Sequence, residues 1–159
     1  MKDNEKFHMR RKDKEIADPA VIEAILEKAT VCRLGLVDRD ESYIVPVNFG
    51  YENNVLYFHS ALKGYKVELI KKNNKVCFEI ETDVEIEKTD KTNCSVKYRS
   101  VIGRGRIYII ENKEEKIHGL KSIMQQCAAG EYSFSKDRLN TVLVARIDVD
   151  SLTGKQAGY

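Results

Sequence analysis

The stretch YIVPVNFGYENNVLYFHSALKGYK, residues 43–66, decides the fold of this chain. Its first two segments, residues 43–51 and 55–60, are rich in aromatic and β-branched side chains, and the three polar residues between them have the composition of a turn. The segment KVELIKKN, residues 66–73, carries apolar residues at a spacing that predicts a helix packed against a core. The stretch therefore predicts a β-hairpin that leads through a short loop into a helix.

The loop between the hairpin and the helix gathers groups that bind phosphate. Ser60 supplies a hydroxyl, Lys63 and Lys66 supply positive charge, and the start of the helix supplies free backbone N–H groups. Pro46 cannot donate a ladder hydrogen bond, which favours an edge strand or a strand that faces a ligand. We therefore expect a phosphate-bearing ligand along the hairpin, with its anionic end at residues 60–66. On residue types alone, an ordinary hairpin with a solvated Lys-rich turn is the more common arrangement.

Composition indicates one globular domain. The chain has 159 residues, of which 42% are hydrophobic and 33% charged. A net charge of +2, from 27 basic and 25 acidic residues, implies no broad basic surface, so we expect no nucleic-acid partner. No apolar run approaches the about 20 residues of a membrane-spanning helix, and residues 1–15 lack the apolar segment of a signal peptide. We therefore expect a cytoplasmic protein with no membrane partner, made of an N-terminal arm, residues 1–17, and one domain, residues 18–159.

The cysteines do not form a metal-binding pattern. They are Cys32, Cys77, Cys94 and Cys127. None of them forms a C-x-x-C pair, and the three histidines have no ligand spacing with them, so we expect no metal site. Cys32 and Cys77 lie in apolar, strand-like segments and are expected to be small buried side chains. Disulfides are not expected in a reducing compartment.

Two further helices are predicted outside the hairpin stretch. Asp18-Pro19 has the composition of a helix start, with Asp as the cap and Pro at the first helical position, and an apolar stripe at helical spacing follows. Asn112 and Glu115 resemble a capping box that starts the second helix. The expected buried face of this helix is Ile117, Leu120, Met124 and Cys127. His118 lies off this face, and we expect no partner for it.

The remaining segments predict strands at residues 30–37, 76–82, 98–110 and 141–149. Gly103 and Gly105 predict a bulge, or a close approach by another backbone or a ligand. Residues 83–93 and the segment before residue 141 are expected to be loops. Together with the hairpin this makes six strands joined mostly by short turns. Such strands usually pair antiparallel, and closure into a barrel hides their edges.

These segments carry a resemblance to a known family. The motifs are MRRKDKEI, VCRLGLVD, YIVPVNFGY, LYFHSALKGYKVELI, VCFEIE, YRSVIGRGR and TGK. In this order and spacing, from residue 9 to residue 155, the chain resembles the FMN-binding split-barrel family of pyridoxamine 5′-phosphate oxidase, and within it the 5-nitroimidazole resistance (Nim) branch. The resemblance implies a mainly β fold: a six-stranded antiparallel split β-barrel with flanking helices that forms a homodimer.

The resemblance also implies where a flavin binds. In the family the flavin ring lies along the first hairpin strand, its phosphate is held where the second strand meets the helix, and the second subunit contacts the flavin at the interface. The matching residues here are Val45, Pro46, Val47 and Asn48 for the ring; His59, Ser60, Ala61 and Lys66 for the phosphate; and Tyr98, Arg99 and Ser100 from the second subunit. Arg33 could also reach the phosphate, although an outward-facing strand arginine explains it equally well. The implied cofactor is FMN, with FAD as the alternative.

His59 is the residue that we expect to take part in chemistry. In the Nim branch the histidine of the F-H-S motif lines the substrate site, and strand alternation places His59 on one face with Val55 and Tyr57. An unperturbed imidazole pKa of about 6.5 suits proton donation to a reduced substrate. A hydrogen bond to the cofactor phosphate or to a backbone carbonyl is an equal alternative. Members of the branch often carry a tryptophan after the central loop; this chain has none, so Tyr98 would have to replace its stacking.

Two functions follow from the resemblance. The first is an FMN-dependent oxidoreductase that passes electrons from NAD(P)H to a small acceptor, such as a nitroimidazole or another nitroaromatic. Since the chain has no G-x-G-x-x-G element, the nicotinamide would bind transiently over the flavin. The alternative is a non-catalytic protein that binds or carries a flavin or haem.

Overall fold

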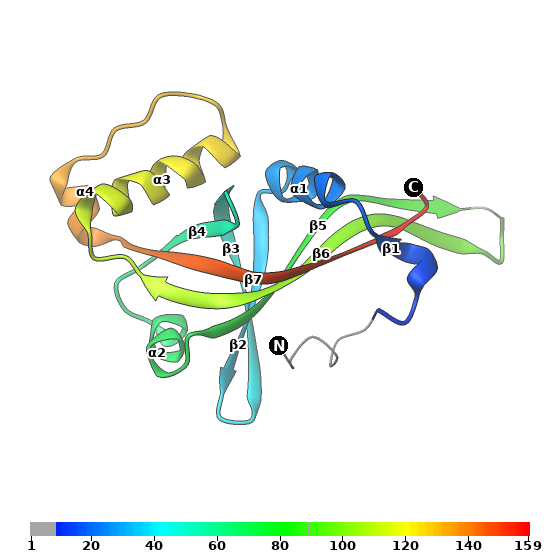
Figure 1. The fold of residues 1–159 in the computed structure, drawn as a ribbon, viewed down its shortest axis with the longest axis horizontal. Coiled ribbons are helices and arrows are strands. Elements are labelled where there is room, and N and C mark those ends of the chain that lie inside the picture. The colour runs from blue at the N-terminus through cyan, green and yellow to red at the C-terminus, as the bar shows by residue number, and fades with distance from the viewer. Residues whose placement is uncertain (1–8, 89) are drawn as a thin grey trace.

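The computed structural model describes residues 9–88 and 90–159 as a closed antiparallel sheet with helices around it (Figure 1). The strands are β1 (Glu15–Ile16), β2 (Val31–Asp38), β3 (Glu41–Glu52), β4 (Val55–Ser60), β5 (Lys75–Lys88), β6 (Cys94–Ile109) and β7 (Leu143–Ala157). The helices are the short 3₁₀ helix η2 (Lys12–Lys14), α1 (Pro19–Lys28), α2 (Tyr65–Lys72), α3 (Lys113–Cys127) and α4 (Lys136–Thr141). The strand order is β1-β7-β4-β3-β2-β5-β6, and a further pairing of β6 with β7 closes the six long strands into a barrel. The predicted six-stranded antiparallel split barrel is therefore confirmed.

The hairpin of β3 and β4 forms as predicted, but its turn has two residues and not three, because Glu52 belongs to β3. Asn53 and Asn54 have φ values of 50° and 63°, the left-handed conformation that a tight hairpin turn requires and that asparagine tolerates. Glu52 pairs with Val55, and the ladder runs to the pair Phe49–Phe58. This register places both phenylalanine rings in the core, where they are fully buried.

Beyond that pair the two strands separate. Residues 41–48 of β3 pair with β2 alone among the described strands, whereas His59 and Ser60 of β4 pair with β7. The barrel is split at this point, and β3 has one open edge there. Pro46 lies in the open-edged section, where a missing backbone donor is tolerated.

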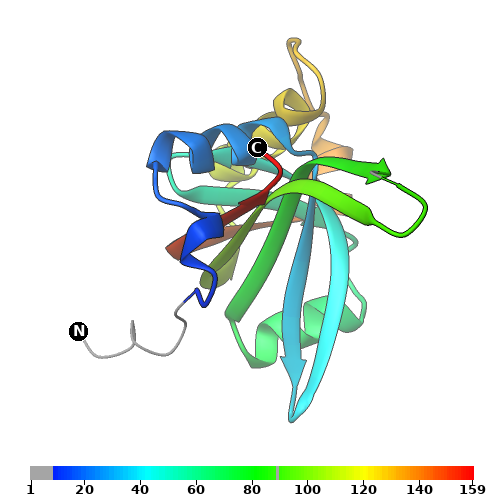
Figure 2. The same cartoon turned by 90° about the vertical axis from the view of Figure 1, so that its right-hand side faces the viewer.

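Two helices close the barrel from opposite sides (Figures 1 and 2). The helix α1 begins as predicted, with the Asp18 carboxylate accepting a hydrogen bond from the backbone N–H of Ala20 at 2.9 Å, and it buries Ile25 and Leu26. The helix α2 buries Val67, Leu69 and Ile70. Both sets join the main core cluster inside the barrel. A second, smaller cluster lies between the outer side of β4 and β7 and the helices α3 and α4.

Two loop predictions need correction. Most of the segment 83–93 is strand, because β5 continues to Lys88 and pairs with β6 as far as Cys94; of its described residues only 90–93 lie outside the strands. Asp83, at φ 57°, forms a bulge that shifts the register, and the charged alternation beyond it hides the strand in the sequence. The segment before residue 141 contains the short helix α4, whose start is capped by the Ser135 hydroxyl. The last strand consequently begins at Leu143 and runs to Ala157.

Four side-chain expectations also need correction. Met124 and Cys127 are exposed, because the face of α3 that meets the sheet is formed by Leu120 and Ile123 with Gly119. Cys77 is exposed as well, since its neighbours on β5 alternate inward, while Cys32 is buried as predicted. The pKa of the Cys32 thiol is strongly raised by this burial. His118 does have a partner: its Nε2 lies 2.7 Å from a carboxylate oxygen of Glu52.

The described part of the predicted N-terminal arm contacts the barrel. Glu15 and Ile16 pair with Lys155 and Gly154 of β7, and Ile16 is buried in the main cluster. Residues 1–8 of that arm lie outside the described residues. Within the described residues no helix is both long and apolar enough to cross a membrane.

Candidate functional site

The predicted site lies where β3 and β4 part. Along β3 the side chains alternate: Val45 and Val47 face the core, and Pro46 and Asn48 are exposed on the outer face. Only the latter two can present side chains to a ligand on that face, while all four residues can offer backbone groups. The Asn48 side-chain amide donates a hydrogen bond to the carbonyl of Thr30 at 3.2 Å, which orients it across the edge between β3 and β2.

The start of α2 leaves its backbone N–H groups without a side-chain cap. Gly64 stands at the helix N-cap with φ 137°, a conformation that favours glycine, and no side chain caps the first turn, so its backbone N–H groups are open to a ligand. Ser60 ends β4 half-buried, opposite Leu143 of β7. Ala61 and Lys63 are exposed in the connecting loop.

Lys66, in the first turn of α2, is half-buried without a carboxylate partner among residues 9–88 and 90–159. Its ammonium lies 5.9 Å from the centre of the Phe58 ring, within the range of a cation–π contact. Burial lowers its pKa. A half-buried cation of this kind is stabilised when an anionic ligand supplies the missing negative charge.

His59 lies at the same strand end and is also half-buried. It pairs with Val144 of β7 and shares its face of β4 with Tyr57, which packs in the second cluster. Burial lowers the pKa of His59, and the positive charges of Arg138 and Lys66 lower it further. The imidazole is therefore neutral at neutral pH until an anion arrives beside it.

Arg138 was not among the predicted site residues, because it lies on a helix, α4, whose segment was predicted to be a loop. The Ser135 hydroxyl accepts a hydrogen bond from the backbone N–H of Arg138 at 3.2 Å, and Leu139 is buried in the second cluster. The ammonium of Lys116 on α3 donates to the carbonyl of Leu139. The one available signal was Ser135, a good N-cap residue in front of a short run of helix-compatible residues.

Tyr98, Arg99 and Ser100 are not brought to the strand end within one chain. Ser60 pairs with Leu143 of β7, and Ser100 pairs with Lys155, twelve residues further along the same strand. At about 3.3 Å per residue this corresponds to about 40 Å along β7. These residues can therefore meet the predicted phosphate site only if a second copy of the chain supplies them.

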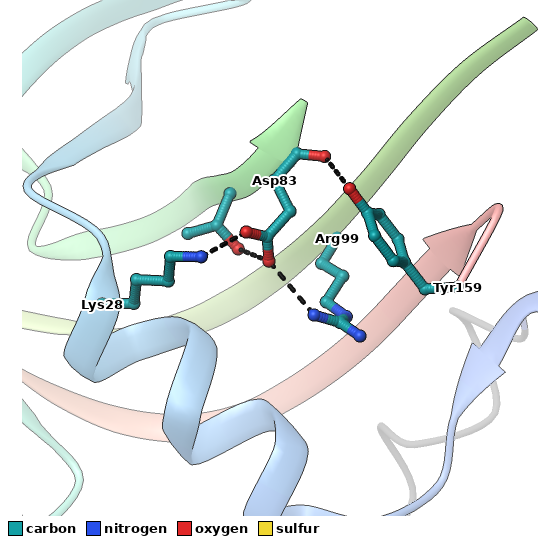
Figure 3. A network of polar contacts seen from close by, with 5 residues as sticks. Lys28, Asp83, Arg99 and Tyr159 are labelled. Atoms are coloured by element: carbon teal, nitrogen blue, oxygen red, sulfur yellow. Dashed lines mark hydrogen bonds and ion pairs between the residues drawn. The ribbon is translucent and has the colours of Figure 1, made fainter. Parts of the chain in front are cut away.

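Arg99 belongs to a polar network around Asp83 (Figure 3). Its guanidinium lies 3.2 Å from one carboxylate oxygen of Asp83, while the ammonium of Lys28 binds the other. The Tyr159 hydroxyl donates to the Asp83 backbone carbonyl at 2.7 Å, and the Tyr159 ring lies 4.4 Å from the guanidinium carbon of Arg99. The network ties the end of α1 and the C-terminal residue to the β5 bulge.

Arg33 is engaged elsewhere. Its guanidinium forms ion pairs with Glu79 at 3.0 Å and Glu81 at 3.1 Å on the outer face of the neighbouring strand β5. This is the arrangement expected of an outward-facing strand arginine. A cavity of about 430 Å³ opens beside it, between Thr30 and Val31 at the start of β2 and Asp83 on β5. Ligand pockets have volumes of this order, but the lining of this cavity comes from the end of α1, β2 and β5 and includes neither Lys66 nor a residue of β3.

The comparisons with known proteins agree on the family. The chain matches the model of a family described as pyridoxamine 5′-phosphate oxidase over residues 18–156. It is similar to the structure of a proposed 5-nitroimidazole antibiotic resistance protein from Bacteroides thetaiotaomicron, with 36% identity over 89% of this chain and 86% of that one and a TM-score of 0.81.

Two more distant structures share the fold. One is an FAD and heme binding protein from Mycobacterium smegmatis, with 15% identity over 92% of this chain and 74% of that one and a TM-score of 0.80. The other is the flavocytochrome Anf3 from Azotobacter vinelandii, with 17% identity over 98% and 75% of the two chains and a TM-score of 0.82. The comparison with curated proteins gives no match.

Proposed function

The chain belongs to the pyridoxamine 5′-phosphate oxidase family, and from this membership we propose that it binds FMN at the split of the barrel and reduces a small acceptor with electrons from NAD(P)H. The observation that carries the proposal is Lys66, a half-buried cation without a carboxylate partner in the described part of the chain, set at an uncapped helix start. An anionic group of the cofactor is the partner that this position lacks.

The phosphate of FMN is proposed to lie between Ser60 and the first turn of α2. Ser60 would donate its hydroxyl, Lys66 its charge, and the uncapped N–H groups of α2 their hydrogen bonds. His59 and Ala61 flank this position on the same strand end. FMN fits the position better than a neutral flavin would, because each of these groups is a donor or a cation. FAD, whose diphosphate is also anionic, is the alternative cofactor.

The flavin ring is proposed to lie against the open edge of β3 at residues 45–48. This edge has backbone N–H and C=O groups without a strand partner among the described residues, and they match the donors and acceptors on the pyrimidine side of a flavin. The exposed side chains of Pro46 and Asn48 would border the ring, while Val45 and Val47 anchor the strand in the core. Bound FMN would supply the redox chemistry, which amino-acid side chains do not provide.

His59 is proposed to give its imidazole proton to the reduced acceptor. It is neutral when the site holds no anion, since burial and the charges of Arg138 and Lys66 lower its pKa. An anion bound beside it would raise that pKa and allow the ring to hold a proton near neutral pH. The acceptor is proposed to be a nitroimidazole or another small nitroaromatic, by analogy with the relative at 36% identity.

The active unit is proposed to be a cytoplasmic homodimer with a flavin at each end of the interface. Support comes from the outer face of the barrel, where Val31, Ile44 and Ile102 are exposed apolar side chains. The strand register aligns Pro46 with Ile102 across β2 and β5, with the ion pair of Arg33 and Glu79 between them, so the exposed apolar side chains flank a charged pair on the face that carries the proposed ring position. A second copy would also bring Tyr98, Arg99 and Ser100 to the flavin.

The test uses the purified protein. We expect it to carry a flavin that is visible by its absorbance, and to lose that absorbance rapidly when NADH or NADPH is added under argon. Parallel lines in steady-state plots with varied donor and acceptor would indicate the ping-pong order that one shared site predicts. A yellow protein that stays oxidised would favour the alternative, a flavin carrier. A colourless protein that ignores added flavin would refute both.

A further inference from the structure

We propose that Arg138 is an anion-binding residue of this site, which receives a phosphate or carboxylate group beside His59. The inference rests on the proposed function for the identity of the ligand only. If the protein binds FMN, the anionic group belongs either to the flavin or to a second, acidic ligand. The juxtaposition of Arg138 and His59 stands without it.

The fold brings α4 to the end of β4. The helix α4 ends at Thr141, and the next strand residues, Leu143 and Val144, pair with Ser60 and His59. Since only Val142 separates the helix from that pair, the last turn of α4 must stand next to the strand end that holds the predicted phosphate. Arg138 lies in this part of the helix.

The helix is held in place from both ends. The Ser135 hydroxyl caps its start, and the Thr141 hydroxyl donates to the carbonyl of Arg138 at 3.1 Å. Leu139, the next residue, is buried in the second cluster, and its carbonyl accepts a hydrogen bond from Lys116 of α3. The backbone of Arg138 is therefore fixed while its side chain remains exposed.

The guanidinium of Arg138 has no hydrogen bond or ion pair within residues 9–88 and 90–159, in contrast to the three arginines that lie on the strands β2, β6 and β7 and pair with carboxylates. Arg33 pairs with Glu79 and Glu81, Arg99 with Asp83, and Arg146 with Glu115 and Asp148. Arg138 instead lies on the helix that directly precedes the strand residue paired with His59. Its positive charge lowers the pKa of His59, and Lys66 acts on His59 in the same direction.

The fold therefore places three basic residues around one strand end: His59 on β4, Lys66 on the helix that follows it, and Arg138 on the helix that precedes its partner strand β7. The charges that act on His59 are both positive. Such an arrangement is unfavourable until a negative group enters it. A guanidinium binds phosphate or carboxylate through two parallel N–H donors, which a lysine cannot reproduce. The chemistry thus selects an oxyanion, either the phosphate of the flavin or the phosphate or carboxylate of a second ligand bound over it.

The first arm of the test compares FMN with riboflavin, which lacks the phosphate. Flavin fluorescence quenching gives both dissociation constants for the wild type, for Arg138→Gln and for the control Lys136→Gln on the same helix. If the flavin phosphate is the ligand, Arg138→Gln weakens FMN binding about 10-fold and leaves riboflavin binding unchanged. Arg138→Lys should recover only part of that loss.

The second arm identifies a separate ligand. Inorganic phosphate is titrated into the FMN-loaded protein while the ring signals of His59 are followed by NMR. If the first arm shows no change, a saturable shift in the wild type that Arg138→Gln abolishes and Lys136→Gln retains assigns Arg138 to a second anionic ligand. If Arg138→Gln alters neither the FMN preference nor the phosphate response, or if Lys136→Gln alters them equally, the inference is wrong.

The arms also separate this inference from the proposed function. A wild-type protein that binds neither flavin refutes the proposed function, and the phosphate titration of the flavin-free protein then tests Arg138 by itself. A wild type that binds FMN while Arg138→Gln behaves identically in both arms refutes only the inference.

Discussion

Phe49 and Phe58 face each other as the last pair of the β3–β4 ladder, and both rings are fully buried inside the barrel. Beyond them β3 follows β2, and β4 follows β7. The two rings therefore hold the strands together at the point where they separate. The core thus fixes the position of both edges of the split, and a ligand bound there meets backbone that is already in place.

The first prediction concerns the phosphate position. Replacing Lys66 by Ala should weaken FMN binding by about 1.5–3 kcal/mol, because a charge-assisted contact to the phosphate is lost. Riboflavin binding should stay within about 2-fold, since riboflavin has no phosphate for the lysine to contact. Isothermal titration calorimetry of both flavins measures the difference. Lys72→Ala is the matched control, because Lys72 is an exposed lysine in the last turn of the same helix.

An unchanged FMN affinity in Lys66→Ala would remove Lys66 from the site. An equal loss for both flavins would mean that the substitution disturbs α2 itself rather than a phosphate contact.

The second prediction concerns His59. Replacing it by Gln should preserve FMN affinity and lower kcat by about 100-fold or more, the usual contribution of a general acid. In the flavin-free wild type, NMR titration of the ring should give a pKa below about 6.5, since burial, Arg138 and Lys66 all act in that direction. Adding FMN should raise this pKa. Full turnover in His59→Gln would end the proton-donor role, and a lost FMN affinity would favour the phosphate-contact alternative.

Local sequence was sufficient for the hairpin and the first helix. The polar residues 52–54 between two segments rich in β-branched and aromatic residues predicted the turn to within one residue, and Asp18 followed by Pro specifies a helix start; neither depends on distant residues. Strand alternation also predicts that Val47 and Asn48 lie on opposite faces of the strand, but it does not say which face is outside. The family resemblance named four ring residues together, and the structure shows which two of them face outward.

Features that depend on distant residues could not be predicted. The bulge at Asp83 breaks the alternation of β5, and the charges that stabilise it come from Lys28 and Arg99. The carboxylate of Glu52 and the imidazole of His118 form a hydrogen bond although they lie 66 positions apart in the sequence, and no local pattern predicts such a contact. Arg138 was hidden for a different reason: α4 has six residues, too few for a helical period to show.

The third prediction concerns the Asp83 network. Asp83 accepts contacts from Lys28 and Arg99 at a position with φ 57°, so Asp83→Asn removes the charge while keeping a residue that tolerates this conformation. We expect a loss of about 1 kcal/mol in the free energy of unfolding at pH 7, measured by urea denaturation. Glu85→Gln, on the exposed strand beyond the bulge, is the control.

The pH dependence of that loss has a defined sign. The Lys28 contact, followed by that of Arg99, lowers the pKa of Asp83 in the folded protein below its unfolded value of about 3.9. At pH values between the folded and the unfolded pKa, the unfolded chain therefore binds more protons than the folded protein. The stabilisation by Asp83 is complete above the unfolded value and is lost as the pH falls through the folded one. A difference between wild type and Asp83→Asn that stays constant down to pH 2 would contradict the ion pairs.

The fourth prediction concerns the contact of α3 with β3. A Cβ atom at Gly50 would lie 2.3 Å from the backbone carbonyl carbon of Ser122, so the helix would have to move away from the sheet. Gly50→Ala should therefore lower the free energy of unfolding by about 3 kcal/mol, at the upper end of overpacking effects. Gly130→Ala, where the nearest atom lies at 3.4 Å, should change it little. Similar denaturation midpoints for the two variants would mean that α3 is not held against Gly50.

The fifth prediction tests the homodimer. Ile44 is 68% exposed on the outer face of β3, so Ile44→Glu costs the isolated chain little, but it places a charge in the proposed interface. We expect this variant to be a folded monomer by sedimentation and to lose FMN, because Tyr98, Arg99 and Ser100 of the second copy would no longer reach the flavin. Ile86→Glu is the matched control: Ile86 is 70% exposed on the outer part of the β5–β6 hairpin, away from Pro46. If Ile44→Glu remains a dimer with bound FMN, the outer face of β3 is not the interface. If it becomes a monomer that still binds FMN tightly, the second copy contributes nothing to the flavin site.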